Sequence, residues 1–357
     1  MTTRWLPLYL GAALAADASA QTAQATRYVL KGDSVAVYNL VGELRVEAGS
    51  GGDVAVELRL GGADAKQLEV QTGVLRGRET LRVIYPADVI SVPTWGRGSN
   101  TTMRVRDDGT FGDGGDHRGW RGEGGGRTVR ITGRGEGLEA YADLRVLVPA
   151  GKRVALHLGV GKAFVTNVDG QIWVDVASAD VAADRTRGVL KIETGSGNVD
   201  LRDATGDVSL ESGSGDITAA NVRGARLKVE TGSGNITVTG AAAPEMAIQT
   251  GSGDVEVTDA QGDNLSFETG SGNVDVALVA TFRTVTIETG SGDVTLKVPP
   301  TIGAEVELDT GSGDIDLGGL TLQVQRIQRD HVEGTIGDGR GRLSIETGSG
   351  NVHLVKS

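Results

Sequence analysis

Apolar and polar residues alternate in short runs along this chain, and glycines interrupt the runs at regular places. In the segment 189–207, Leu190 and Ile192 are separated by a charged residue, which is the pattern of a strand that buries one face. A Gly-Ser-Gly run at 195–197 breaks the pattern, because glycine adopts the backbone conformations of a tight corner at little cost. The alternation resumes at Val199. The segment therefore predicts two short strands and two corners.

The same unit recurs along the second half of the chain as variants of Glu-Thr-Gly-Ser-Gly-Asn-Val. Its sixth residue falls at Asn198, Asp216, Asn235, Asp254, Asn273, Asp293, Asp314 and Asn351, in steps of 18, 19, 19, 19, 20, 21 and then 37 residues. Such a period in a glycine-rich, strand-like sequence is typical of a solenoid, in which each repeat packs against its neighbours. We therefore predict an all-β protein, a β-solenoid with about 19 residues and two short strands per coil.

Stacked coils would align equivalent side chains into ladders with a spacing of about 4.8 Å. Two apolar ladders would form the core, one at Ile192, Leu210, Val229, Ile248, Phe267, Ile287, Leu308 and Ile345, the other at Val199, Ile217, Ile236, Val255, Val274, Val294, Ile315 and Val352. By the same parity, a ladder of hydroxyls points inward and needs hydrogen-bond partners. These residues are Thr194, Ser212, Thr231, Thr250, Thr269, Thr289, Thr310 and Thr347.

A further ladder of mostly acidic residues would point outward. Its members are Glu193, Glu211, Glu230, Gln249, Glu268, Glu288, Asp309 and Glu346. A solvated face that blocks sheet-to-sheet association is the interpretation we favour. The alternative is a strip that collects cations or cationic peptides.

Residues 1–25 have the pattern of a signal peptide. Arg4 supplies positive charge, the stretch from Trp5 to Ala16 is apolar but too short to span a bilayer, and small residues offer cleavage sites ending at Ala20 and Ala25. We therefore predict export, with the mature chain in the periplasm, at the cell surface or outside the cell. No other stretch is long and apolar enough for a transmembrane helix.

Residues 26–152 alternate as strands do, but without a fixed period. We interpret them as irregular N-terminal coils of the same stack, and residues 153–357 as the regular solenoid. A Gly/Arg-rich stretch at 95–127 lacks aliphatic residues for a core, so we expect a disordered or extruded insertion there. Aromatic residues lie among its arginines, and they are Trp95, Phe111 and Trp120. Such a mixture is able to bind single-stranded nucleic acid or glycans, although the composition favours a solvated insertion.

The last step of 37 residues equals about two repeats. We expect a coil without the motif between Leu317 and Leu343, with the segment from Gln323 to Glu333 looping outward or closing the end. The edge at Asn351–Val355 then needs a cover, from that segment or from a partner chain, because an unpaired terminal coil invites association. Self-association through the terminal coil is one expected interaction.

The overall composition excludes some classes of binding partner and one source of stability. A formal net charge of −12 argues against nucleic acid and against anionic membrane surfaces. The chain contains no cysteine, so its stability must come from the stacked core rather than from disulfides. The same absence argues against a lipid-anchored N-terminus.

These features together resemble one known family. A signal peptide, the turn step from Val146 to Gly151 with Pro149, and the reiterated Thr-Gly-Ser-Gly-Asp/Asn-Val/Ile motif are similar to the bacterial putative-adhesin family of secreted domains. The resemblance spans roughly residues 28–356, the Gly/Arg-rich insertion excepted. It implies a right-handed β-solenoid at the cell envelope or surface, with no assigned chemistry.

Calcium binding is one hypothesis for the corners. The four aspartates of the repeated Gly-Ser-Gly-Asp corners, Asp216, Asp254, Asp293 and Asp314, would supply the oxygen ligands that calcium prefers. Only one corner per coil carries the motif, however, and asparagine alternates with aspartate. An Asp or Asn that caps the turn through backbone N–H groups explains the alternation better, since asparagine separates like charges.

Catalysis is a third hypothesis, because parallel β-helices include polysaccharide lyases and hydrolases. Such sites need a local acid or base cluster that breaks the repeat, whereas the acids here recur evenly. The histidines are scattered, at His117, His157, His331 and His353. Only His331, beside Asp330 and Glu333, is a candidate. We assign no catalytic, cofactor-binding or metal-binding residue.

The sequence therefore favours an exported, non-enzymatic, structural or adhesive protein that acts without a cofactor. Its expected partners are envelope glycans, peptides or proteins. A calcium-binding surface module is the second interpretation, and a polysaccharide-active enzyme is the third.

Overall fold

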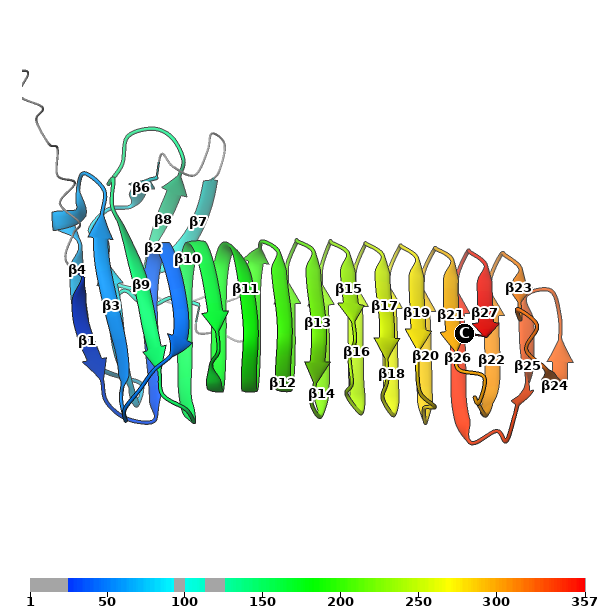
Figure 1. The fold of residues 1–357 in the computed structure, drawn as a ribbon. Helices are drawn as coiled ribbons and strands as arrows, with labels where there is room; N and C mark the ends of the chain where they lie inside the picture. The colour runs from blue at the N-terminus through cyan, green and yellow to red at the C-terminus, as the bar shows by residue number, and fades with distance from the viewer. Residues whose placement is uncertain (1–24, 93–99, 113–125, 357) are drawn as a thin grey trace, which may run out of the picture.

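The computed structural model describes residues 25–92, 100–112 and 126–356. They form an elongated all-β structure with a short 3-10 helix, η1 (Ala65–Gln67), near one end (Figure 1). The all-β prediction is confirmed. The predicted signal peptide at 1–25 lies outside the described residues except for Ala25. Among the described residues, no helix has the length and apolar character needed to cross a membrane.

A column of parallel layers makes up most of the length. It begins with three long strands that run through corners, β10 (Lys152–Thr166), β11 (Asp169–Ser196) and β12 (Val199–Ser212). Shorter strands follow on one side as β14 (Arg226–Thr231), β16 (Glu245–Thr250), β18 (Asn264–Thr269), β20 (Thr284–Thr289), β22 (Ala304–Thr310) and β26 (Gly341–Thr347). On the other side lie β13 (Ile217–Arg223), β15 (Ile236–Thr239), β17 (Val255–Ala260), β19 (Val274–Leu278), β21 (Val294–Val298), β23 (Ile315–Asp316) and β27 (Val352–Lys356).

The register of these strands aligns equivalent residues. Val199 pairs with Ile217, which pairs with Ile236, and the same alignment joins Leu210 to Val229 and Val229 to Ile248. Both predicted apolar ladders are buried, apart from the half-buried Ile315 near the far end. The repeated corners therefore lie in one column, and the core is continuous along it.

The ladder of threonine and serine points inward as predicted, and it joins neighbouring layers. Thr231 Oγ1 donates to the carbonyl of Gly215 at 3.0 Å, and Thr250 Oγ1 donates to that of Gly234 at 2.9 Å. Each hydroxyl reaches a corner carbonyl of the preceding layer, so burying it leaves no polar group unpaired. These bonds fix the corner of one coil to the strand of the next.

Glycine is required where one corner lies on another. Gly215 has a φ of 154°, and a Cβ placed on it would lie 2.1 Å from the carbonyl oxygen of Gly197. No other residue fits this position without moving the layers apart, so the repeated motif follows from the close approach of the layers.

The N-terminal end of the column contains both parallel layers and antiparallel strands. The strand β2 (Ser34–Ala48) is a true layer, since it pairs in parallel with β10 from Val35 opposite Val154 onward. Regular stacking therefore includes β2 as well as the segment after Arg153. Beyond β2 lie β1 (Thr26–Leu30), β3 (Val54–Gly61), β4 (Glu69–Leu75), β5 (Arg78–Ile84) and β9 (Tyr141–Val148). Both β5 and β9 pair in parallel with β2, so they add one further layer to the stack. The pairs β1–β3, β3–β9 and β4–β5 are antiparallel, so β1, β3 and β4 close the end.

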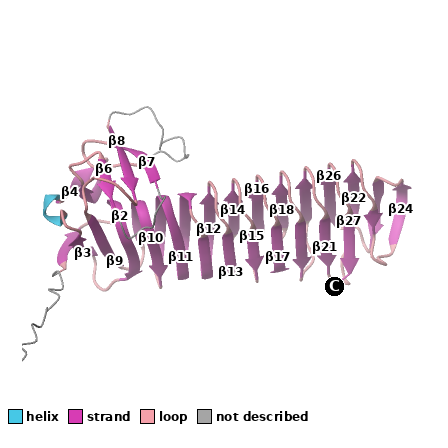
Figure 2. Ribbon diagram, turned by 90° about the horizontal axis from the view of Figure 1, so that it is seen from above, coloured by secondary structure: helices cyan, strands magenta, loops and turns pink. Residues whose placement is uncertain are grey.

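A small second sheet projects from this end (Figures 1 and 2). It consists of β6 (Val89–Ser91), β7 (Asn100–Val105) and β8 (Arg127–Thr132). The insertion at 95–127 was predicted to be disordered or extruded, and disorder is wrong for residues 100–112, because Met103, Val105 and Phe111 are buried. The strand was missed because its few apolar residues stand among many arginines and glycines, so the alternation is weak in the sequence. Trp95 and Trp120 lie outside the described residues.

The C-terminal end has a spatial order that differs from the sequence order. The last strands, β26 and β27, lie between the layer of β20 and β21 and the layer of β22 and β23. The chain terminus is accordingly not at the end of the column in Figure 1. The 37-residue step is filled by an antiparallel hairpin of β24 (Leu322–Ile327) and β25 (His331–Ile336), and β25 pairs with β22.

Two predictions are settled by this arrangement. A coil without the motif between Leu317 and Leu343 is wrong, because the chain skips one layer and later returns to fill it. The segment from Gln323 to Glu333 was predicted either to loop outward or to close the end. It closes the end, because it lies in the hairpin whose strand β25 pairs with β22. The strand over Asn351–Val355 lies between two others, because β27 pairs with β21 over Val352–Lys356 and with β23 at Val352 and His353, so it is not the last strand of the column.

Candidate functional site

The Asp/Asn residues of the corners form hydrogen bonds that run from layer to layer. Asn198 Oδ1 accepts the backbone N–H of Asp216 at 2.9 Å, and Asp216 Oδ1 accepts that of Asn235 at 2.8 Å. The same bond recurs up to Asn351, whose Oδ1 accepts the N–H of Asp314 at 3.0 Å. One oxygen of each of these side chains is therefore engaged with the backbone, except at Asp314, whose carboxylate binds Arg329 at 3.0 Å.

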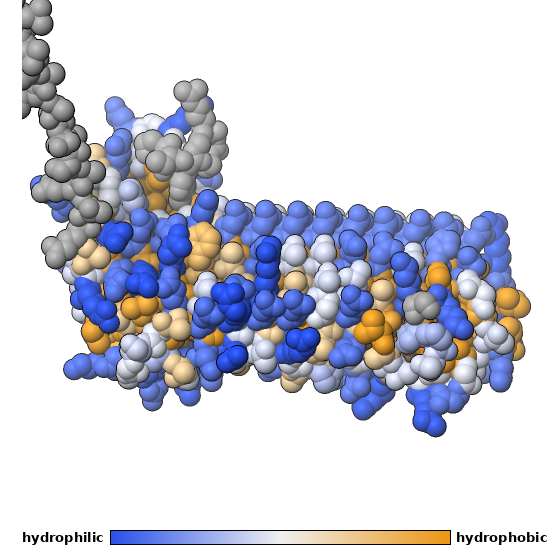
Figure 3. Space-filling model, in the orientation of Figure 1, coloured by the Kyte–Doolittle hydropathy of each residue, from blue (hydrophilic) through white to orange (hydrophobic). Residues whose placement is uncertain are grey.

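This geometry supports capping as the role of the Asp/Asn ladder. Either side chain supplies the oxygen that the bond needs, which explains why the two alternate. Within the described ranges, no group of three or more His, Cys, Asp or Glu side chains is arranged to hold a metal ion. The corners form a hydrophilic edge along the top of the column in Figure 3.

Near the small sheet, the positions of the outward acidic ladder are occupied by other residue types, and their side chains are buried. By strand register, the positions before Glu193 belong to Tyr38, His157 and Asp175. His157 is completely buried, its Nδ1 lies 3.1 Å from Asp175 Oδ2, and the Tyr38 ring stacks on it at 4.4 Å. Phe111 lies edge-on to both rings, which attaches the segment after β7 to the column.

The first glutamate of the ladder is also held by its neighbours. Glu193 is buried, accepts a 2.7 Å hydrogen bond from Trp173 Nε1 and forms a 2.7 Å ion pair with Lys191. The Lys191 ammonium lies 5.5 Å from the centre of the Trp173 ring. The acidic ladder is thus packed at this end and solvent-facing farther along, from Gln249 to Glu288.

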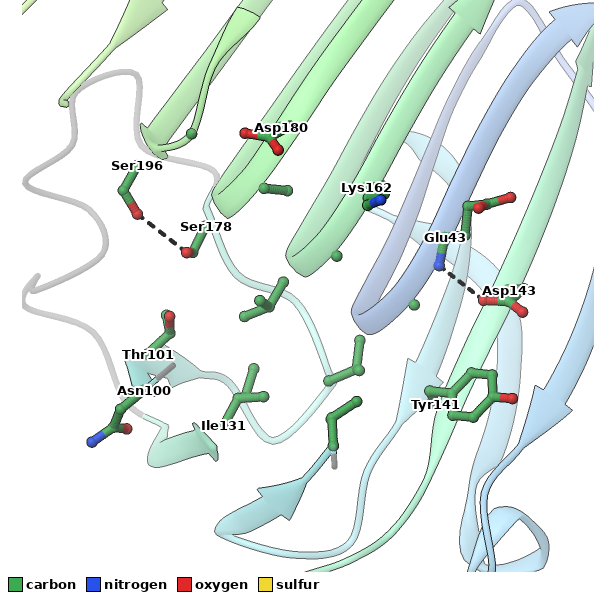
Figure 4. Close-up of a pocket in the computed structure, with 17 residues that line it drawn as sticks. Glu43, Asn100, Thr101, Ile131, Tyr141, Asp143, Lys162, Ser178, Asp180 and Ser196 are labelled. Atoms are coloured by element: carbon green, nitrogen blue, oxygen red, sulfur yellow. Dashed lines mark hydrogen bonds between the residues drawn. The ribbon is translucent and has the colours of Figure 1, made fainter. Parts of the chain in front are cut away.

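A groove with a volume of about 940 Å³ lies where the small sheet approaches the corner column (Figure 4). The column side is lined by Glu43, Lys162, Ser178, Asp180 and Ser196, together with corner glycines. The opposite side is lined by Val92, Asn100, Thr101 and Ile131, and Tyr141 and Asp143 of β9 lie at one end. The sequence marked Ser196 and Gly197 as a corner of the repeat, but it assigned no residue of this groove to a binding site.

The acids of the groove are partly used by the fold. Asp143 Oδ1 accepts the backbone N–H of Glu43 at 2.9 Å, and Asp180 Oδ1 accepts that of Asn198 at 2.9 Å. Burial raises the pKa of the Asp143 carboxyl above 3.8, the hydrogen bond from Glu43 opposes this shift, and the negative charge of Glu43 reinforces it. The groove therefore favours a ligand that places positive charge or hydrogen-bond donors against these oxygens.

A family model for the Toastrack DUF4097 domain matches residues 146–355. The chain belongs to this family. The Toastrack match agrees with the resemblance to a putative-adhesin family of unknown function, and that prediction is confirmed.

The other comparisons add little. The crystal structure of a "putative cell adhesion protein" from Clostridium sporogenes ATCC 15579 is 11% identical, and the match covers 94% of this chain and 100% of that one with a TM-score of 0.19. A score this low supports no argument about fold or function. No curated protein matches the chain.

The Toastrack match includes part of one side of the groove, since Glu43 on the column side precedes residue 146. Lys162, Ser178, Asp180 and Ser196 lie within residues 146–355, whereas the small sheet and β9 up to Arg145 precede them. The groove therefore combines repeats typical of the family with a wall built from residues outside the match.

The histidines of this Toastrack protein have carboxylate partners that we did not predict. His331 Nδ1 lies 2.6 Å from Asp309, rather than pairing with Asp330 or Glu333. His353 Nδ1, in β27, lies 3.8 Å from Asp316 in the neighbouring strand β23, whereas His157 lies in β10, next to β2. His117 lies outside the described residues. The 18-residue spacing of His157 and Asp175, which equals one coil, is the signal that was available in the sequence.

Proposed function

We propose that this Toastrack protein is an exported, non-enzymatic interaction protein of adhesin type that acts at the bacterial cell envelope. Its scaffold is proposed to be a right-handed β-solenoid with about 19 residues and two strands per coil, since crossovers between parallel strands are right-handed in nearly all proteins. The expected partners are envelope glycans, peptides or proteins.

The observation that carries the proposal is the layer-to-layer use of polar groups along the column. Asp/Asn oxygens and buried threonine hydroxyls bind the backbone of the neighbouring layer, so the repeats serve to build a rigid support. A rigid column of this kind holds a binding surface at one end away from whatever is attached to the other end. The groove at its N-terminal end is the place where the repeat is broken by other residues.

Export and binding are tested with the full-length gene. After expression in a bacterial host, N-terminal sequencing of the processed protein is expected to show a start after Ala20 or Ala25. The exported protein, labelled with a fluorophore, is expected to bind envelope fractions of the encoding bacterium saturably and to leave their polysaccharides intact. Absence of saturable binding, or release of sugar products by the protein, would contradict the proposal.

A further inference from the structure

We infer that the groove between the small sheet and the corner column binds an oligosaccharide of amino sugars. This inference rests on the proposed function, because it names the ligand of an envelope-binding protein. The volume of about 940 Å³ is at the upper end of the range for small-molecule sites, roughly 300–1,000 Å³, so the groove accommodates several linked units rather than one.

The hydrogen-bonding groups of the groove suit a ligand rich in hydroxyls. Ser178 and Ser196, which bond to each other at 3.1 Å, and Thr101 on the facing wall each both donate and accept. Asn100 adds an amide, and the acids add acceptors (Figure 4). Sugar hydroxyls also donate and accept, so they match this mixed set on both walls.

The column wall is unsuited to an extended peptide. Peptides that bind β-structures usually add a strand to a free sheet edge. The strand β10, which supplies Lys162, is paired with β2 on one side and with β11 on the other. The ligand-facing groups of this wall are therefore side chains, which favours recognition of hydroxyls there. On the facing wall, β7 pairs only with β8 among the described strands, so a peptide that adds a strand to β7 is the competing ligand, and the peptide arm of the titration tests it.

Tyr141 provides an apolar surface at the end of the groove. Its side chain lies against Gly61, where an added Cβ would come within 2.3 Å of the ring, and the residue remains 36% exposed. A ring supported on one side by backbone is a rigid platform with a polar tip. Such a platform packs against the C–H face of a pyranose ring.

The charge of the groove selects among sugars. Glu43, Asp143 and Asp180 carry three negative charges when ionised, and Lys162 carries one positive charge. Arg45 pairs with Glu43, so the net charge of these five groups is −1. An excess of negative charge attracts cations and repels anions. Ammonium groups of amino sugars are therefore favoured, and uronic-acid polymers are disfavoured.

The test uses isothermal titration of the exported protein with a tetrasaccharide of β-1,4-linked glucosamine. The tetrasaccharide of galacturonic acid, of the same length and opposite charge, is the comparison ligand. Saturable binding of the glucosamine probe and no binding of the galacturonate probe are expected. A higher affinity for a lysine-rich peptide than for the glucosamine probe would overturn the inference.

A matched pair of substitutions locates the site. Asp180→Asn lies in the groove and Asp216→Asn lies two corners farther along the same ladder, and in both the new amide oxygen is able to accept the same backbone N–H. Asp180→Asn is expected to weaken glucosamine binding about tenfold, because a hydrogen bond to a charged group is lost. Asp216→Asn is expected to leave it unchanged.

Two outcomes separate this inference from the proposed function. If the protein binds envelope fractions but not the glucosamine probe, or if both Asn variants bind the probe like the wild type, the inference fails while the proposed function stands. If the protein binds no envelope fraction, the proposed function is contradicted, and the inference that rests on it is contradicted with it. Competition of the probe against envelope binding, lost in Asp180→Asn alone, would support both.

Discussion

The middle of the column and its N-terminal end use the same ladder positions in different ways. In the middle, the acidic ladder is solvent-facing and the Asp/Asn ladder caps the corners. At the N-terminal end, the acidic ladder becomes Tyr38, His157 and Asp175, and the Asp/Asn ladder becomes Glu43, Lys162 and Asp180. Where the residues repeat, they build the scaffold, and where they depart from the repeat, they form a packed cluster and a groove.

The largest effect is expected from a corner in the middle of the column. Gly215→Ala places a Cβ 2.1 Å from the carbonyl oxygen of Gly197, so it should lower the free energy of unfolding by about 4 kcal/mol or more. Urea denaturation measures the change. The control is Gly52→Ala, where the added methyl meets no atom within 4 Å. Equal, small effects of the two substitutions would show that the layers do not lie in contact at the corners.

A second large effect is expected at the N-terminal end. Phe111→Ala removes a buried ring from the Tyr38 and His157 cluster and should cost about 3–5 kcal/mol of local stability. Hydrogen exchange should accelerate in β7 and β8 and remain slow from β14 to β20. Val279→Ala, at a residue that is 53% exposed, should change neither region. Acceleration throughout the column would contradict the separation of the two regions.

A smaller effect is expected from the inward hydroxyls. Thr250→Val keeps the shape of the side chain but removes the 2.9 Å hydrogen bond to the Gly234 carbonyl, so it should cost about 1 kcal/mol. Thr218→Val, at an exposed position of β13, is the matched control and should cost less than about 0.5 kcal/mol. A shift of the thermal midpoint that is the same for both would argue against a structural role of the ladder.

The smallest effect is expected from the pH dependence at Asp143. Because burial raises the pKa of this half-buried carboxyl in the folded protein, the folded state binds the proton more tightly than the unfolded state does. The contribution of Asp143 to stability therefore falls as pH rises from about 3.8 through the raised pKa. Asp143→Asn should remove this decline, which chemical denaturation at a series of pH values would detect. A decline that is unchanged in the variant would assign it to other groups.

Much of the column was predictable because each layer obeys the same local rule. The alternation around Ile192 and Val199 fixes the buried faces, and the glycines at 195 and 197 fix the corner between them. The inward direction of Thr250 follows from the same parity. A period repeated this often leaves one consistent way to stack the coils.

The parts that escaped prediction depend on residues far apart in the sequence. The contact of Phe111 with His157, and the hydrogen bond from Glu43 to Asp143, have no periodic signal. The hairpin at 322–336 is also invisible to the repeat, because a motif count does not say that the chain skips a layer and returns. The groove also escaped prediction, because it forms where the small sheet and the corner column, which are far apart in the sequence, approach each other.

The stacking order of the layers is tested most directly by cysteine pairs in this cysteine-free chain. Ser291 and Ser349 are 58 residues apart but lie in neighbouring layers, where Gly292 N donates to Ser349 O at 3.0 Å. Ser312 lies one layer farther, since Gly350 N donates to Ser312 O at 3.3 Å. Neighbouring layers are about 4.8 Å apart and next-nearest layers are about 10 Å apart, whereas a disulfide needs Cα atoms closer than about 7 Å. Oxidation should therefore join the Ser291→Cys and Ser349→Cys pair but not the Ser291→Cys and Ser312→Cys pair, and the opposite result would contradict the stack.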